Sequence, residues 1–317
     1  MGEFILKRLL LMIPTVLGVV TTVFFAIHLA PGDPVHLMIP PETPSAQVAE
    51  KEAEIRRRYG FDKPLHVQYL TYLGKVARLD FGRSIRQDTV IVDDLKRRVV
   101  NTMQLGLLGL AMSVVLGIGL GVISAIKRGT WIDNVTMLGA LFGVSIPNFW
   151  FGLLIMLGAA LYLGILPASG FGGAIYTWGG LKYAILPAIT LGLSGAGILA
   201  RFTRSSVLDV VLQDYVRTAR AKGLRERVVV MRHVLKNALI PIITLVGLQF
   251  GAMLSGTVIV ETVFAWPGVG RYLISAINGR DFPVVQATVI FIATGFVLVN
   301  LLTDLTYALI DPRIRFR

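Results

Sequence analysis

Long apolar runs are the feature that most restricts how this chain can fold. Six of them stand out, and most are long enough to cross a lipid bilayer, which takes roughly 20 apolar residues. They cover residues 9–30, 99–126, 135–163, 185–199, 238–264 and 284–310. Only 16% of the 317 residues are charged, which excludes a soluble multidomain enzyme and a disordered chain. The chain is therefore predicted to be an all-α integral membrane protein with six transmembrane helices.

The first apolar run follows Lys7 and Arg8, and a cleaved signal peptide also begins with basic residues. This run is longer than a typical signal-peptide core, and the sequence Ala26-Ile-His-Leu-Ala30 is a poor cleavage site. We therefore predict that residues 1–30 form a retained N-terminal anchor helix. The fourth run, residues 185–199, is predicted to be a short span.

The distribution of basic residues predicts the orientation in the membrane. The net charge is +12, and Lys and Arg in short loops concentrate on the cytoplasmic side of membrane proteins. With both termini in the cytoplasm, the cytoplasmic pieces hold 16 Lys and Arg residues, nine of them between Arg201 and Lys236. The two short outer loops hold three. A basic balance can also indicate nucleic-acid binding, but here it is accounted for by topology, and no nucleic-acid partner is expected.

A long polar segment, residues 31–98, separates the first two runs and is predicted to be a small external helical cap. It carries 12 basic and ten acidic residues, so it is nearly neutral. A helix is expected to open at Pro44-Ser45, with i,i+4 ion pairs from Glu52 to Arg56 and from Glu54 to Arg58. Pro64 suits the first position of a second helix. The cap either docks an extracytoplasmic partner or acts as a lid that only packs on the membrane bundle.

Small residues recur at four-residue spacing inside the predicted spans, which allows helix backbones to approach closely. The pairs are Gly117/Gly121 and Gly139/Gly143, with Gly247, Gly251 and Ser255 forming a longer series. They indicate a packed bundle of the five-helix core, residues 99–310. The remaining residues, 311–317, form a predicted cytoplasmic tail.

Residues suited to catalysis or to metal binding are scarce. The chain has no cysteine, which excludes disulfides, a thiolate nucleophile and Cys-ligated metals. Its four histidines lie too far apart in sequence for a local zinc motif. We therefore predict no catalytic, cofactor or metal site in this chain.

The most informative stretch is the predicted cytoplasmic loop, residues 201–237. Its alanines and basic residues favour a short helix that ends at Gly223, a natural left-handed helix terminus. A second basic amphipathic helix is expected to follow, with Val228, Met231, Val234 and Leu235 on one side. Three interpretations compete: a solvated loop that merely follows the positive-inside rule, a helix–turn–helix for nucleic acid, and a docking helix for a cytoplasmic protein. Attachment to membrane spans at both ends argues against the second.

The loop contains the run Tyr215-Val-Arg-Thr-Ala-Arg-Ala-Lys-Gly223-Leu, followed by Asn237-Ala-Leu-Ile-Pro241. This run resembles the EAA loop of permease subunits of binding-protein-dependent ABC importers. The family pattern begins with a Glu-Ala-Ala triplet. In this chain Thr218-Ala219-Arg220 stands in place of the triplet, so its first Glu is replaced. That form is typical of the dipeptide/oligopeptide/nickel branch.

The resemblance extends over nearly the whole chain. Similar motifs are Pro31-Gly-Asp-Pro34, Asp80-Phe-Gly82 with Ser84, residues 260–270, Arg280-Asp-Phe-Pro283 and the ending from Asn300 to Arg313. A basic anchor followed by a large first outer loop is similar to the first of the two permeases in such systems. The resemblance implies a type I ABC importer permease fold in a bacterial or archaeal cytoplasmic membrane.

The resemblance also implies specific partners. They are a homologous second permease subunit, two cytoplasmic ABC ATPase subunits and an extracytoplasmic substrate-binding protein. ATP and Mg would be used by the ATPase subunits, which agrees with the absence of a Walker A pattern from this chain. The ATPase-coupling residues would be Tyr215, Arg217, Thr218, Ala219, Arg220, Ala221, Lys222, Gly223 and Leu224. Small residues in this set would permit close docking, and Arg217, Arg220 and Lys222 would pair with acidic groups of the ATPase.

Polar residues in or beside apolar spans are candidates for the translocation path, because such residues are costly in lipid. Glu261 and Trp266, at the outer end of the fifth run, are two candidates, and Glu261 either lines a gate or pairs with Arg271 or Arg280. Asn101 and Gln104 open the second run and are candidates to face the path.

The alternative function is a stand-alone secondary transporter. It would be expected to show internal repeats and charges near the membrane midplane, and neither is evident. A membrane enzyme would need a polar constellation that this sequence lacks. Dipeptides, oligopeptides, glutathione and nickel complexes all remain open as substrates.

Overall fold

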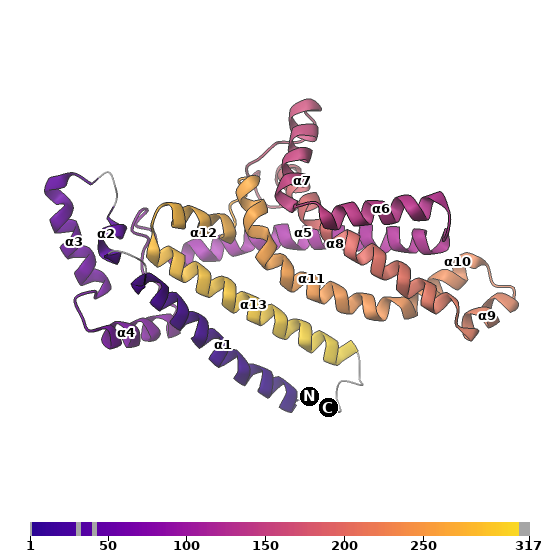
Figure 1. Cartoon of the computed structure of the whole chain (residues 1–317), viewed down its shortest axis with the longest axis horizontal. Coiled ribbons are helices and arrows are strands. Elements are labelled where there is room, and N and C mark those ends of the chain that lie inside the picture. The colour runs from indigo at the N-terminus through magenta and orange to yellow at the C-terminus, as the bar shows by residue number, and fades with distance from the viewer. Residues whose placement is uncertain (1, 30–32, 40–42, 311–317) are drawn as a thin grey trace. The chain divides into compact units, whose positions relative to one another are not determined.

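The computed structural model describes residues 2–29, 33–39 and 43–310, and most of these residues are helical (Figure 1). The longer helices are α1 (Gly2–His28), α3 (Ser45–Tyr59), α4 (Leu65–Ala77), α5 (Ile91–Ile126), α6 (Trp131–Ser145), α8 (Trp178–Val211), α11 (Leu235–Val263), α12 (Val269–Asn278) and α13 (Phe282–Ile310). The shorter ones are α2 (Pro34–Met38), α7 (Asn148–Ile155), α9 (Asp214–Ala221), α10 (Glu226–Val228) and the π-helical segments η1 (Met156–Tyr162) and η2 (Val229–Val234). The all-α fold class is confirmed. The predicted tail, residues 311–317, lies outside the described residues.

Four helices are long and apolar enough by themselves to cross a membrane. They are Arg8–His28, Ile91–Ile126, Trp178–Val211 and Phe282–Thr303. Two further pairs qualify only when taken together, because each is bent at a short break. When each pair counts as one span, the total reaches the six that the apolar runs predict.

The third apolar run is not one straight helix as the sequence suggested. Trp131–Ser145 and Asn148–Tyr162 meet at an angle of 110°. The break falls at Ile146, which is extended, and at Pro147, which precedes α7. A proline disfavours helical geometry in the residue before it, so Pro147 accounts for the bend.

The fourth span is longer than predicted. The apolar run covers residues 185–199, but α8 extends from Trp178 to Val211. Arg201 and Arg204 lie in the last part of α8. These charged residues end the apolar run in the sequence, but the helix continues past them. Thr177 caps the helix start by accepting a hydrogen bond from the backbone N–H of Gly180 at 3.0 Å.

The described chain divides into two compact units. The first comprises residues 1–100 and 268–298, and the second comprises residues 101–267 and 299–317. Within the first unit, a small apolar cluster of Ile27, Val35, Met38 and Ile55 joins α2 and α3 to the end of α1. The predicted helical segment between residues 31 and 98 is thus present, and its helices follow Pro44 and Pro64 as helix caps.

The ion pairs predicted for this segment form only in part. Arg56 contacts Glu52 at 2.8 Å, as the i,i+4 spacing predicts. Arg58 instead lies 3.7 Å from Asp88, and Glu54 pairs with Lys51 at 3.2 Å. Asp88, which lies in a loop, thus takes the place of Glu54 as the partner of Arg58. Residue spacing within one helix does not reveal such a contact with a loop.

Within the second unit, α8 packs against both α6 and α11 (Figure 1). Its glycines and those of α5 allow the backbones to come close. A β-carbon at Gly121 would lie 2.6 Å from the carbonyl oxygen of Ala200, and one at Gly143 would lie 3.1 Å from that of Leu193. The predicted close approach therefore holds at Gly121 and Gly143, whereas Gly139 has nothing within 4 Å.

Candidate functional site

A short helix and a glycine turn form the centre of the candidate site, as the sequence predicts. Helix α9 ends at Ala221, and the N–H of Lys222 donates to the carbonyl of Thr218 at 3.0 Å. Gly223 follows with φ of +74°, in the left-handed region that glycine adopts without strain. Its N–H donates to the carbonyl of Arg220 at 2.9 Å, which closes the turn.

The inner face of α9 is fixed to the rest of its unit by apolar packing. Val216 is fully buried and Ala219 is 5% exposed. Both belong to a buried cluster with Ala125 of α5, Val207 of α8, and Val229, Val234 and Ala238 of the following segments. The inner face of α9 is therefore in direct contact with the ends of α5 and α8.

The outer face of α9 and the turn after it are open to solvent. Eight of the nine predicted coupling residues are exposed: Tyr215, Arg217, Thr218, Arg220, Ala221, Lys222, Gly223 and Leu224. Ala219 is the exception because it is buried, and its contribution to docking stays a prediction. Its spacing of three from Val216 places it on the buried side of the helix.

The three basic residues of this surface differ in their partners. Arg220 forms a two-pronged ion pair with Glu226, with nitrogen–oxygen distances of 3.1 and 2.7 Å. The hydrogen bonds from Arg220 to the Glu226 carboxylate raise the pKa of Arg220 above its usual value. Arg217 lies 3.9 Å from an exposed Asp214, and Lys222 has no carboxylate within 4 Å among the described residues. Lys222 and Arg217 are thus the cations most available to a partner.

The segment after the turn differs from its predicted pattern. Val229, Val230 and Val234 are buried, whereas Met231 is 57% exposed. The prediction assumed an α-helical period, but residues 229–234 form a π-helical turn, which shifts the positions that face inward. Asn237, at the start of α11, donates to the Tyr215 hydroxyl at 3.1 Å and so ties α9 to α11.

Sequence reasoning missed an ionic cluster that lies beside this site. The guanidinium of Arg204 on α8 donates to both carboxylate oxygens of Asp133 on α6, at 2.7 and 2.8 Å. The N–H of Gly129 donates to the same carboxylate at 3.0 Å, and so does the Ser124 hydroxyl from α5. Asp133 is 3% exposed. The sequence offers only a weak signal for this pair. Asp133 stands just before the apolar run 135–163, and Arg204 stands just after the run 185–199.

The four candidate path residues lie near the opposite end of α11. Over the residues from Asn237 to Glu261 an α-helix rises roughly 36 Å, so these residues do not meet the coupling residues. Glu261 is fully buried and accepts a hydrogen bond from Thr102 at 2.6 Å.

The other three candidates also take part in packing contacts. The Trp266 indole is fully buried and donates to the backbone carbonyl of Asn101 at 3.0 Å. The Asn101 side chain donates in turn to the carbonyl of Pro267 at 3.0 Å. Gln104 accepts from the N–H of Ile175 at 3.3 Å. These contacts tie the start of the second apolar run to the segments that carry Ile175 and Trp266, and a role in a gate stays a prediction.

Comparison with known proteins gives two family matches that together cover almost the whole chain. Residues 117–316 match the family described as binding-protein-dependent transport system inner membrane component. Residues 1–105 match the N-terminal region described for the same kind of membrane component.

Curated relatives match from end to end. A protein of Salmonella choleraesuis named glutathione transport system permease protein GsiC is 43% identical over 317 residues, which is all of both chains. The GsiC of Escherichia coli strain K12 is 40% identical over the same length. A dipeptide transport system permease protein, DppB of Alkalihalophilus pseudofirmus, is 39% identical, again with both chains fully covered.

Solved structures match in fold. The inward-facing MetNI methionine ABC transporter has a TM-score of 0.56 at 16% identity, covering 68% of this chain and 96% of the other. An amino acid ABC transporter crystallised with histidines has a TM-score of 0.53 at 17% identity, covering 68% and 94%. The fold is therefore that of type I ABC importer permeases.

Proposed function

The chain belongs to the family of binding-protein-dependent transport system inner membrane components, and on that premise we propose that it carries peptides across the cytoplasmic membrane. It is a multi-pass permease subunit of an ABC importer, not a stand-alone secondary transporter. The proposed substrates are dipeptides, oligopeptides or a compound of peptide character such as glutathione. The names of full-length relatives at 39–43% identity support this class.

The proposed partners are a homologous second permease, two cytoplasmic ABC ATPase subunits and an extracytoplasmic substrate-binding protein. ATP hydrolysis then takes place in the ATPase subunits, with Mg, and this chain holds no cofactor of its own. The 16 basic residues of the predicted cytoplasmic pieces, against three in the short outer loops, support cytoplasmic N- and C-termini. The same orientation puts α9 in the cytoplasm and residues 31–98 outside.

The observation that carries the coupling proposal is the two-sided character of α9. Its inner face is buried against the ends of α5 and α8, and its outer face and the Gly223 turn are exposed. An ATPase subunit that seats this outer face moves α9 when ATP closes the ATPase pair, and the buried face transmits the movement to the spans. Lys222 and Arg217 supply positive charge for acidic groups on the ATPase.

Replacing Gly223 with Asp tests this proposal. Nothing lies within 4 Å of a β-carbon at this position, and Asp is one of the few residues that tolerate a left-handed backbone. The substitution therefore adds bulk and negative charge to the docking surface at a backbone cost of about 1 kcal/mol. In proteoliposomes that contain the whole complex, we expect uptake and substrate-stimulated ATPase activity to fall at least tenfold.

Gly164→Asp is the matched control. Gly164 has φ of +61°, has nothing within 4 Å, is exposed, and lies in the loop between the third and fourth apolar runs, which the proposed orientation places outside. It should leave uptake within twofold of the unmodified protein. Full transport and full ATPase stimulation in Gly223→Asp would overturn the coupling assignment.

A further inference from the structure

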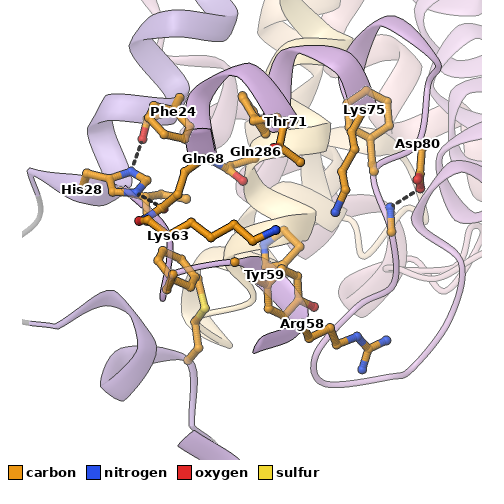
Figure 2. A pocket seen from close by; sticks show the side chains of 18 of the residues that line it. Phe24, His28, Arg58, Tyr59, Lys63, Gln68, Thr71, Lys75, Asp80 and Gln286 are labelled. Carbon is orange, nitrogen blue, oxygen red and sulfur yellow. Dashed lines mark hydrogen bonds between the residues drawn. The ribbon is translucent and has the colours of Figure 1, made fainter. Parts of the chain in front are cut away.

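A cavity of about 290 Å³ lies in the first unit, whereas α9 and the Gly223 turn belong to the second. Figure 2 shows it between α1, α3, α4 and the start of α13. Phe24 and Ile27 come from the last turns of the candidate span Arg8–His28, and Pro283 and Gln286 come from the first turns of the span Phe282–Thr303. The cavity therefore lies where two membrane spans end, at the level of the lipid head groups.

The walls of the cavity are apolar on one side and basic on the other. Phe24, Ile27 and Met38, which line it, are all less than 9% exposed, so they form an apolar floor. The basic residues that line it are Arg57, Arg58, Lys63, Lys75 and Arg83, whereas Asp80 is the one carboxylate in the lining. This lining favours a ligand that is anionic at one end and apolar at the other.

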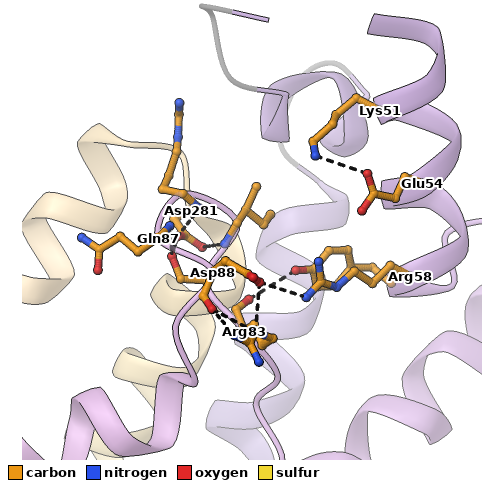
Figure 3. Close-up of polar contacts among 11 residues, drawn as sticks. Lys51, Glu54, Arg58, Arg83, Gln87, Asp88 and Asp281 are labelled. Carbon is orange, nitrogen blue, oxygen red and sulfur yellow. Dashed lines mark hydrogen bonds and ion pairs between the residues drawn. The ribbon is translucent and has the colours of Figure 1, made fainter. Parts of the chain in front are cut away.

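The two lysines of the cavity, unlike Arg58 and Arg83, have no ion-pair partner among the described residues. Arg58 and Arg83 both contact Asp88, at 3.7 and 2.9 Å, and Lys51 outside the cavity contacts Glu54 (Figure 3). Lys63 and Lys75 have no carboxylate within 4 Å among the described residues. Their ammonium groups project toward the same space above Tyr59 (Figure 2).

Tyr72 also lines the cavity, and its hydroxyl is unpartnered in the part of the chain that the structure describes. It is shielded from solvent and has no hydrogen-bond partner among the described residues. Burial raises the pKa of Tyr72, so the hydroxyl keeps its proton and remains a donor. A buried donor without an acceptor is unfavourable, and an anionic oxygen in the cavity relieves that cost.

We propose that this cavity binds the phosphate head group of an anionic membrane lipid, held by Lys63 and Lys75 and by the Tyr72 hydroxyl. The volume suits a head group rather than a whole lipid, so the acyl chains remain in the bilayer beside α1 and α13. With the proposed orientation, the outer leaflet supplies the lipid. Each lysine near an anionic membrane surface strengthens binding about fivefold.

Lysine footprinting on the full chain, purified with its partner subunits, tests this site. The complex is placed in nanodiscs of phosphatidylcholine alone or with roughly one-third phosphatidylglycerol, and an amine-reactive reagent labels accessible lysines. We expect phosphatidylglycerol to slow labelling of Lys63 and Lys75 about fivefold. Lys51 and Lys96 serve as controls because they lie in the same segment outside the cavity, and their labelling should change less than twofold.

Three results would overturn the proposal. Unchanged labelling of Lys63 and Lys75 would show that no lipid occupies the cavity. Equal protection of all four lysines would show only diffuse attraction to a charged surface. Protection by inorganic phosphate in pure phosphatidylcholine discs would identify a free anion, not a lipid, as the occupant.

The Tyr72→Phe variant gives an independent measurement. It removes no hydrogen bond within the described protein, so the fold should be retained. We expect the protection of Lys63 and Lys75 by phosphatidylglycerol to weaken about threefold. Unchanged protection would show that the hydroxyl does not contact the lipid and would contradict the site as drawn.

Discussion

Asp133 on α6 is the centre of a polar cluster beside α9. Its carboxylate accepts from Arg204 on α8, Ser124 on α5 and the backbone of Gly129. Ser124 directly precedes Ala125, and Arg204 lies one turn before Val207. Ala125 and Val207 both pack against the inner face of α9. The cluster therefore ties three helices together at the end where α9 is attached.

The Asp133→Asn substitution should destabilise the protein by about 2 kcal/mol, because it leaves the Arg204 guanidinium without its counter-charge. Arg204 is partly exposed, with 28% of its side chain accessible, which keeps the cost below that of a fully buried pair. Thermal unfolding in detergent, followed by tryptophan fluorescence, measures the effect as a lower Tm. Asp209→Asn, at an exposed carboxylate on α8, the helix of Arg204, should leave Tm unchanged. Equal Tm values for the two variants would show that the cluster is not stabilising.

At the level of single residues, the sequence predicted backbone features better than side-chain directions. Gly223 was placed correctly because only a few residues tolerate its backbone angles. The burial of Ala219 was not foreseen, because a small residue suits a close contact on either side of a helix. The Asp133–Arg204 pair joins residues 71 positions apart, and the sequence alone does not indicate that they meet.

At the level of helices, the contact between α5 and α8 depends on glycine. A β-carbon at Gly117 would lie 2.9 Å from the carbonyl oxygen of Ala196, and one at Gly121 would lie 2.6 Å from that of Ala200. Both distances are well inside ordinary van der Waals contact, so any larger residue must push the helices apart. The same helix carries Gly119, which has nothing within 4 Å.

The Gly121→Ala and Gly119→Ala variants should therefore change stability in opposite directions. Gly121→Ala should lower the free energy of unfolding by about 2 kcal/mol through overpacking. Gly119→Ala should raise it by about 0.5–1 kcal/mol, since alanine favours the helix and meets no obstacle. Tm values of the two variants measure this difference, and a similar shift for both would contradict the close approach of α5 and α8.

The helix boundaries followed from the sequence only where a specific residue dictates them. Pro44 and Pro64 mark the starts of α3 and α4, although Pro64 is the N-cap and not the first helical residue that the sequence predicted. Pro147 breaks the third span, a consequence that the continuous apolar run concealed. No residue in the sequence indicates the π-helical turn of residues 229–234. This turn changes which side chains face inward, and Met231 is therefore exposed.

At the level of the whole molecule, the class of protein was predictable because lipid imposes simple rules. Spans must be long and apolar, and basic residues collect on one side. These rules gave the membrane class, the number of spans and the proposed orientation. The partners proposed to cover the exposed face of α9 lie in other chains, so the sequence could indicate them only through the run from Tyr215 to Leu224.

The central claim is that the exposed face of α9 seats an ATPase subunit. The chain has no cysteine, so a single Ala221→Cys substitution introduces the only thiol in this subunit, at an exposed position of α9. A thiol-specific photo-crosslinker attached there, in the purified complex that still transports, reports directly on the neighbour. Thr71→Cys, exposed in the segment assigned to the outside, is the matched control.

The account predicts that Ala221→Cys crosslinks to an ATPase subunit and that Thr71→Cys does not. A transporting complex in which Ala221→Cys gives no ATPase adduct, or in which Thr71→Cys gives the same adduct, would contradict it.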